Sequence, residues 1–295
     1  MASFPVAGVR LGHLSGARTG VTVLLFPSGS VGSGEVRGGA PASREIDLLE
    51  PARAVTRVDA VVFAGGSAFG LSTADGVMRY LAERGQGYPT AGGPVPIVPT
   101  AGIFDLAEAD GPPPGPAEGY AAAVAAARDE PSPSGRVGGG AGATVGKWKG
   151  REHAVPGGLA VAHAEVEDVR IAALAVVNAV GDVIGADGSV VAGSLAPADH
   201  VAFPTPAPFE ETAANTTLVA LVTDASLDKA ACLLLAHSAH DGFARALDPV
   251  HTRYDGDLAV VVATGGARPS ADPSLDRLRI AATTVTAEAI RAAPR

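Results

Sequence analysis

The sequence predicts a layered α/β fold. Short apolar runs typical of buried strands are mixed with helical patterns, and glycines at the ends of the runs indicate hairpin-like turns, which argues against a pure doubly wound sheet. Aromatic residues make up only 4% of the 295 residues, so Ala, Val and Leu must build the core through tightly packed elements. The 38 glycines and 23 prolines separate apolar periodic segments and therefore indicate turns and not disorder.

The elements follow from apolar periodicity and from the residues that interrupt it. Strands are predicted at 21–26, 59–64, 94–98, 158–162, 169–183, 217–223 and 258–263. Helices are predicted at 69–81, 117–128, 228–247 and 272–293, the last beginning at Asp272 and Pro273. Proline clusters on both sides of 117–128 predict that this helix belongs to a surface insertion. Residues 135–150 are predicted to form a glycine-rich loop, and residues 195–214 a proline-rich linker.

Charge and cysteine content exclude several classes of function. The net charge is −9 without any Lys/Arg run, which argues against nucleic acid or an anionic membrane as partner. The single cysteine, Cys232, rules out an intrachain disulfide and is predicted to be a buried structural thiol. The N-terminus lacks a signal-peptide pattern and no apolar run reaches membrane-spanning length, so a cytoplasmic location is expected.

Three motifs imitate known sites without matching them. The loop 141–148 resembles a phosphate-binding loop, but Ala141 and Trp148 occupy positions that require glycine and a hydroxyl residue. The run 65–70 resembles a hydrolase nucleophile elbow with the wrong glycine spacing, and is predicted to be a strand-to-helix turn. His237 and His240 have metal-ligand spacing but no third ligand on that helix. The sequence therefore predicts neither a metal site nor a cofactor.

The junction between Asn215 and Thr216 is a candidate for self-cleavage. A polar, proline-rich run ends at Asn215, and the apolar strand 217–223 follows Thr216. Cleavage before Thr216 turns its amide nitrogen into an α-amine with a pKa of about 8, close to the hydroxyl that it must activate. The simpler interpretation is that Thr at the start of a strand reflects ordinary β-propensity.

Two further positions carry groups suited to this chemistry. Asn178 lies within an apolar strand, where its amide either satisfies a buried backbone group or donates to a developing oxyanion. Asp255 and Asp257 enter a buried strand together, as either a solvated turn or a pair that positions an amine or a hydroxyl.

Taken in order, five segments resemble one family, the L-aminopeptidase/D-esterases, which includes β-peptidyl aminopeptidases and the nylon-oligomer endo-hydrolase. The segments are 65–71, 138–147, Asn178, 215–218 and 250–257. The resemblance covers nearly the whole chain. It implies a self-processing hydrolase of N-terminal-nucleophile type, with two β-sheets stacked between helix layers in a topology distinct from that of the proteasome type. The whole chain, 1–295, is then one domain, cut into an α chain, 1–215, and a β chain, 216–295.

The resemblance also implies roles for individual residues. Thr216 is the nucleophile after cleavage between Asn215 and Thr216, and Asn178 is the oxyanion donor. Lys147 is the site lysine, with Lys149 as the alternative two residues away, and Asp255 and Asp257 form the acidic pair. Some members of the family have Ser as the nucleophile, and aminopeptidase members tend to have Tyr in place of the site lysine. With Thr216 and Lys147 at these two positions, the chain resembles the nylon-oligomer branch. A lysine beside the new α-amine favours its neutral form by charge repulsion.

The expected partners are a small peptide or amide substrate and the associated α and β chains, with a homo-oligomer implied by the resemblance. Two alternatives remain open. Ornithine acetyltransferase is a self-cleaving threonine enzyme of related fold, although its cleavage region typically reads Ala-Thr-Met-Leu where this chain has Asn215-Thr216-Thr217-Leu218. The second alternative is a binding protein that has the same fold but does not cleave itself.

Overall fold

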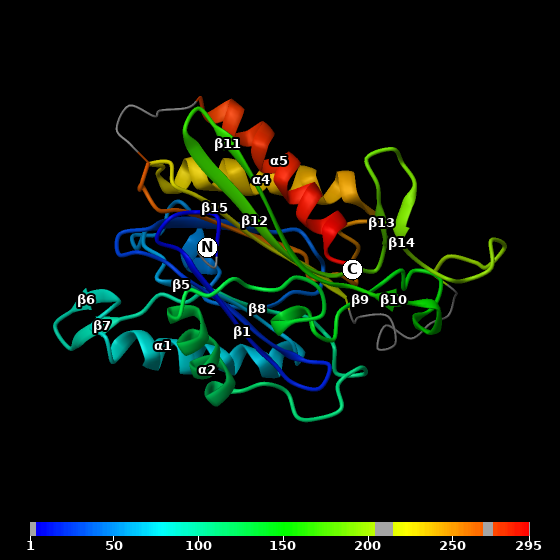
Figure 1. The fold of residues 1–295 in the computed structure, drawn as a ribbon, viewed down its shortest axis with the longest axis horizontal. Coiled ribbons are helices and arrows are strands. Elements are labelled where there is room, and N and C mark those ends of the chain that lie inside the picture. Colours follow the sequence, from blue (N-terminus) through cyan, green and yellow to red (C-terminus); the bar gives the residue numbers. More distant parts are fainter. Residues whose placement is uncertain (1–3, 204–214, 268–273, 295) are drawn as a thin grey trace.

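Two five-stranded β-sheets lie face to face between two pairs of helices in the computed structural model (Figure 1). The structure describes residues 4–203, 215–267 and 274–294. The order of layers is helices, sheet, sheet, helices, which confirms the predicted layered α/β fold and the sandwich that the family resemblance implies.

The first sheet comes entirely from residues 10–102. Its strand order is β1 (Arg10–Ser15), β2 (Gly20–Leu25), β5 (Ala60–Ala64), β8 (Thr100–Gly102) and β4 (Ala42–Arg44). β5 runs parallel to β8 and the other neighbours are antiparallel. All residues of β2 and β5 are buried, because helices cover one face and the second sheet covers the other.

Helices α1 (Thr73–Ala82) and α2 (Pro116–Ala127) cover the outer face of the first sheet. On α1 the buried residues Ala74, Val77 and Leu81 recur at helical spacing. The two helices approach closely at glycines, since a Cβ on Gly76 would collide with the backbone of Pro116. The prediction of a surface insertion at 117–128 is therefore wrong, because Ala122, Ala123 and Ala126 of α2 are core residues packed on α1 and the sheet.

The second sheet combines strands from both sides of the Asn215–Thr216 junction. Its order is β11 (Gly158–Val166), β12 (Val169–Asn178), β15 (Thr216–Thr223), β17 (Leu258–Ala263) and β3 (Val31–Val36). β15 lies antiparallel to β12 and parallel to β17. The C-terminal segment thus lies inside the sheet, with strands of the N-terminal segment on either side of it.

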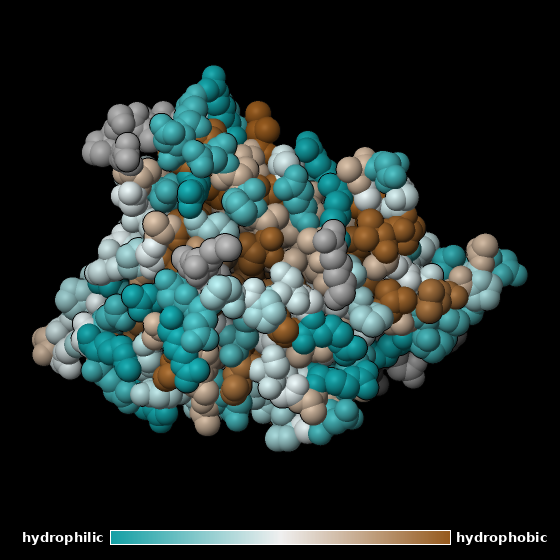
Figure 2. Space-filling model, viewed as in Figure 1, coloured by the Kyte–Doolittle hydropathy of each residue, from teal (hydrophilic) through white to brown (hydrophobic). Residues whose placement is uncertain are grey.

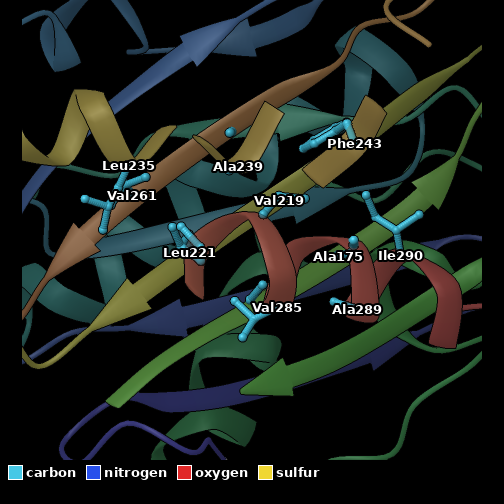
Figure 3. Close-up of a cluster of buried hydrophobic side chains, with 14 of the residues drawn as sticks. Ala175, Val219, Leu221, Leu235, Ala239, Phe243, Val261, Val285, Ala289 and Ile290 are labelled. Atoms are coloured by element: carbon cyan, nitrogen blue, oxygen red, sulfur yellow. The ribbon is translucent and has the colours of Figure 1, made fainter. Parts of the chain in front are cut away.

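Helices α4 (Lys229–Ala246) and α5 (Leu275–Ala292) cover the outer face of the second sheet. Asp228 caps α4 by accepting a hydrogen bond of 2.8 Å from the amide of Ala231. Figure 3 shows Leu235 and Phe243 of α4 and Val285 and Ile290 of α5 facing the strands. The predicted start of the last helix at Asp272 lies outside the described residues.

Short elements connect these layers. They are β6 (Tyr88–Thr90), β7 (Gly93–Val95), β9 (Thr144–Val145), β10 (Val155–Pro156), β13 (Asp182–Ile184), β14 (Val190–Ala192), β16 (Leu247–Asp248), and the 3-10 turns η1 (Asp47–Leu49), η2 (Ser67–Ser72), η3 (Gly138–Gly140) and η4 (Arg151–His153). The predicted strand 169–183 is interrupted, since β12 ends at Asn178 and β13 begins at Asp182. The predicted strand 94–98 is only the short β7.

The surface carries an apolar region near β13 and β14, at the right of Figure 2. Val190 and Val191 of β14 and the nearby Leu195 are exposed. No helix in the described part of the chain combines the length and the hydropathy that a membrane span requires.

Candidate active site

The predicted nucleophile and the predicted oxyanion donor lie on neighbouring strands. In the antiparallel pairing of β12 with β15, Asn178 is the direct partner of Thr216. Asn178 is the last residue of its strand and Thr216 the first of its own. Both side chains are buried, Asn178 completely and Thr216 with 3% exposed. The register of the sheet therefore brings together two residues that are distant in sequence.

The carbonyl group of Asn215 is held by two donors. The hydroxyl of Thr216 donates to its oxygen, and the backbone amide of Gly256 donates to the same oxygen over 2.9 Å. A parallel bridge between Asn215 and Asp255 holds the two segments together. A carbonyl that accepts two hydrogen bonds is polarised towards nucleophilic attack, and the nearest hydroxyl is that of Thr216.

The side-chain amide of Asn178 is fixed in one orientation. Its oxygen accepts hydrogen bonds of 2.9 Å from Lys147 Nζ and 2.9 Å from the backbone amide of Thr144. Its nitrogen donates to the carbonyl oxygen of Phe104 over 3.1 Å. Two donors on one side and an acceptor on the other define which amide atom is nitrogen, so the amide N–H groups have a defined direction.

Lys147 is the lysine that reaches the site. Its Nζ contacts both the side-chain oxygen of Asn178 and, over 3.0 Å, the Asn178 backbone carbonyl. Lys149 instead lies over the Trp148 ring, 5.0 Å from its centroid. Burial, reinforced by repulsion from Arg151, lowers the pKa of Lys147 to about 7. Lys147 therefore titrates near neutral pH, well below the ordinary range of lysine.

Asp255 is buried and tightly hydrogen-bonded. One carboxylate oxygen accepts from the backbone amide of Val180 over 3.1 Å, and the other from the Thr252 hydroxyl over 2.6 Å. Burial, together with repulsion from Asp257, raises the pKa of Asp255 to about 7. Lys147 and Asp255 are therefore both poised to gain or lose a proton near neutral pH, which is typical of functional sites.

Asp257 holds the strand that begins at the nucleophile. One oxygen accepts from the backbone amide of Thr217 over 2.7 Å, and the other lies 2.8 Å from Nδ1 of His251. Both aspartates are 1% exposed, so the interpretation of 255–257 as a solvated turn is wrong. The pair supports the junction from the turn that precedes β17, the strand parallel to β15.

The structure adds four residues that sequence reasoning missed. Phe104 and Thr144 orient Asn178 through their backbone groups, Gly256 donates to the Asn215 carbonyl, and His251 contacts Asp257. His251 and Gly256 stand in the quoted segment 250–257, where the glycine between two aspartates was an available signal. Thr144 lies in the segment 138–147, but Thr144 and Phe104 act through backbone groups, which leave no signature in side-chain identity.

Other side chains singled out in the sequence are structural. His240 is buried, with Nε2 3.1 Å from the carbonyl oxygen of Glu35, and His237 lies at 3.7 Å from the Glu35 carboxylate. Cys232 is buried, and burial raises the pKa of its thiol to about 12. Gly66 turns from β5 into η2 with a φ of +83°, a conformation that favours glycine.

Comparison with known proteins agrees with this architecture. The model of peptidase family S58 matches residues 4–293. An uncharacterized aminopeptidase of Mycobacterium leprae is 41% identical over 295 residues, covering 90% of this chain and 79% of the relative. A 6-aminohexanoate-oligomer endohydrolase of Agromyces sp. is 32% identical over 275 residues, covering 88% and 74%.

Solved structures share the fold at lower sequence identity. A β-aminopeptidase of Burkholderia sp. superimposes with a TM-score of 0.73 at 23% identity, covering 99% of this chain and 85% of that one. The L-aminopeptidase D-Ala-esterase/amidase of Ochrobactrum anthropi, described as a variant of the Ntn hydrolase fold, gives a TM-score of 0.67 at 20% identity, covering 98% and 84%. The resemblance predicted from five separated segments is thus confirmed, and the chain belongs to peptidase family S58.

Proposed function

We propose that this chain cleaves itself between Asn215 and Thr216 and then uses Thr216 as an N-terminal nucleophile. Its family membership makes it a hydrolase of peptide or amide bonds. The observation that carries the proposal is the geometry of the junction. The Thr216 hydroxyl donates a hydrogen bond to the Asn215 carbonyl oxygen, which also accepts one from the Gly256 amide.

Self-cleavage proceeds in two steps on these groups. The Thr216 oxygen attacks the Asn215 carbonyl carbon, the hydroxyl proton passes to the Thr216 nitrogen, and the C–N bond breaks, which leaves an ester and an amine. The Gly256 amide stabilises the oxyanion that forms at the Asn215 oxygen. A water molecule then hydrolyses the ester to a new carboxylate on Asn215, a free hydroxyl on Thr216 and a free α-amine.

Turnover of an external amide reuses the same residues. The new α-amine accepts the hydroxyl proton as Thr216 attacks the substrate carbonyl, and the proton passes to the departing amine. A water molecule then hydrolyses the acyl ester on Thr216, which releases the acid product and restores the hydroxyl. The amide nitrogen of Asn178 donates to the substrate oxyanion, a contribution typically worth about 3–4 kcal/mol. Lys147, whose Nζ donates to the Asn178 side chain, favours the neutral form of the α-amine by charge repulsion. Asp257 accepts from the Thr217 amide and so fixes the strand that carries the nucleophile.

The proposed substrates are short linear peptides or amides. The relatives at 41% and 32% identity are named an aminopeptidase and a 6-aminohexanoate-oligomer endohydrolase, and these names support a peptide or an amino-acid oligomer as the substrate of this chain. Thr216 and Lys147 resemble the nylon-oligomer branch, so the class extends to oligomers of ω-amino acids.

Intact mass measurement of the purified protein tests the proposal. By share of the 29.2 kDa chain, processing gives fragments of about 21 and about 8 kDa, the smaller beginning at Thr216. Thr216→Ala is expected to remain one chain without hydrolase activity, whereas Thr216→Ser keeps a hydroxyl and is expected to process.

The neighbouring threonine provides the matched control. Thr217 is buried, and its hydroxyl has no hydrogen-bond partner among the described residues. Thr217→Val should therefore process like the wild type. Cleavage of Thr216→Ala at the same bond, or a wild-type protein that remains intact and hydrolyses peptides, would show that Thr216 is not an N-terminal nucleophile.

A further inference from the structure

Three side chains of metal-ligating type converge at the end of the loop 147–153, and none of them belongs to the proposed catalytic residues. They are Glu152 and His153, on η4, and His200. One ligand atom from each lies within 4.8 Å of the other two. Nε2 of His153 is 3.6 Å from the Glu152 carboxylate, and the His153 and His200 rings meet edge-on with centroids 5.1 Å apart.

Backbone hydrogen bonds hold the two segments together on both sides of this group. The amide of Leu195 donates to the carbonyl of His153 over 2.9 Å, and the amide of Phe203 donates to the carbonyl of Trp148 over 2.8 Å. His200 therefore lies in a segment tied at both ends to the loop 147–153. The proximity of the three side chains follows from this backbone arrangement as well as from their own orientation.

The electrostatics of the loop leave Glu152 directed towards the histidines. Arg151, its neighbour, pairs with Glu108. Within the described part of the chain, the salt bridge of Glu152 is with His153. The His153 side chain is 24% exposed and Glu152 is 69% exposed, so an ion from solvent can reach both, and Glu152 can rotate without disturbing the core.

We propose that Glu152, His153 and His200 form a site for a zinc ion. Two imidazole nitrogens and one carboxylate oxygen are a ligand set that Zn²⁺ takes, with water in the fourth position. Bond lengths of about 2.0–2.2 Å place the ligand atoms of a tetrahedral zinc about 3.3 Å apart, so a small closure of this group is sufficient. Each imidazole would bind the ion through one ring nitrogen in its neutral form.

The bound ion acts as a brace between two functional segments. One ligand pair is on the loop that carries Lys147, and the third ligand is on the segment that leads along the chain to Asn215. Zinc therefore stabilises the folded arrangement of these segments against local opening and raises the thermal stability of the protein by mass action.

Zinc titration of the full-length protein, purified without a histidine tag, tests the site. Isothermal titration with zinc chloride is expected to give one ion per chain, and His153→Ala or His200→Ala to weaken binding at least tenfold. Glu152→Gln keeps the shape of the side chain and removes the charge, with an expected loss of several-fold. Cobalt(II) at the same site should show the visible absorption of a tetrahedral complex.

A histidine elsewhere on the surface provides the control. His163 is exposed on β11, and His163→Ala should bind zinc as the wild type does. The thermal midpoints of all variants are compared without metal, so that a folding defect is recognised. Equal weakening in His163→Ala, or binding unchanged by His153→Ala and His200→Ala, overturns the site. Neither result bears on processing at Thr216, which intact mass reports independently.

Discussion

Among the individual residues, Lys147 carries the clearest pH dependence. Burial lowers its pKa in the folded protein to about 7, whereas the unfolded chain keeps the ordinary value near 10.5. Between these values the unfolded state binds a proton that the folded state does not. The free energy of unfolding therefore rises with pH across this window, by up to about 1.4 kcal/mol per pH unit from this group.

Replacing Lys147 by Met removes this dependence. We expect the stability advantage of Lys147→Met over Lys147 to be largest at pH 7 and to shrink towards pH 10. Loss of the lysine also leaves the pKa of Asp255 higher, which disfavours the variant further as the pH rises. Urea unfolding at several pH values, in a Thr216→Ala background that keeps one chain, measures the difference. A difference that does not change with pH would show that Lys147 is not desolvated.

Asn178 is the second residue whose role a single substitution separates. Asn178→Asp keeps the size of the side chain but replaces the nitrogen that donates to the Phe104 carbonyl and, in the proposal, to the substrate oxyanion. We expect kcat to fall about a hundredfold or more when the two chains, 1–215 and 216–295, are co-produced so that processing is bypassed.

A variant of the same strand controls for lost stability. Val176 is fully buried on β12, so Val176→Ala destabilises the sheet without altering the amide. If both variants lose the same stability, only Asn178→Asp should lose kcat. A near-normal kcat in Asn178→Asp would mean that the amide has only a structural role.

At the level of elements, the turn before β17 determines where the nucleophile lies. A Cβ on Gly256 would lie 2.7 Å from the Thr216 hydroxyl oxygen and 3.0 Å from the Ala40 carbonyl oxygen. Gly256→Ala should therefore displace the hydroxyl from the Asn215 carbonyl and slow self-cleavage at least tenfold. The time course of the intact and cleaved masses after synthesis measures this rate.

A glycine in an exposed hairpin gives the comparison. A Cβ on Gly92, between β6 and β7, would approach only the Thr90 hydroxyl, at 3.8 Å. Gly92→Ala is expected to process normally. Equal rates for Gly256→Ala and the wild type would show that the close approach of this turn does not position Thr216.

For the whole molecule, the strand order of the second sheet predicts how the two chains behave after cleavage. β15 and β17 of the C-terminal segment lie between β12 and β3 of the N-terminal segment, and α4 and α5 pack on strands from both. Cutting one peptide bond leaves these hydrogen bonds and buried surfaces in place. We expect the fragments to co-elute on gel filtration and to separate only in denaturant.

The elution volume also tests the expected homo-oligomer. Separation of the two fragments in native buffer would contradict the interleaved sheet.

Residues 216–295 produced alone should not fold. Their two neighbouring strands and two helices lack the strands of the N-terminal segment that bury their faces.

Elements with a strong apolar pattern were predictable from the sequence. β2, β5, β15, α4 and β17 were predicted to within a residue or two, because each has an apolar run bounded by turn residues or a cap. β3 (Val31–Val36) was not, since its glycines at 32 and 34 are unfavourable in strands. Close packing explains them: a Cβ on Gly32 would lie 2.5 Å from Val58.

The sequence by itself determined the layered α/β class and the family, because local periodicity and short motifs can be recognised from the order of residues. It also determined the candidate site residues through the chemistry of their side chains: Thr216, Asn178, Lys147, Asp255 and Asp257. Only the tertiary structure decided which atoms meet. Strand register makes Asn178 the partner of Thr216, and burial brings the pKa values of Lys147 and Asp255 to about 7. Distances and desolvation depend on segments far apart in the chain, which no local pattern specifies.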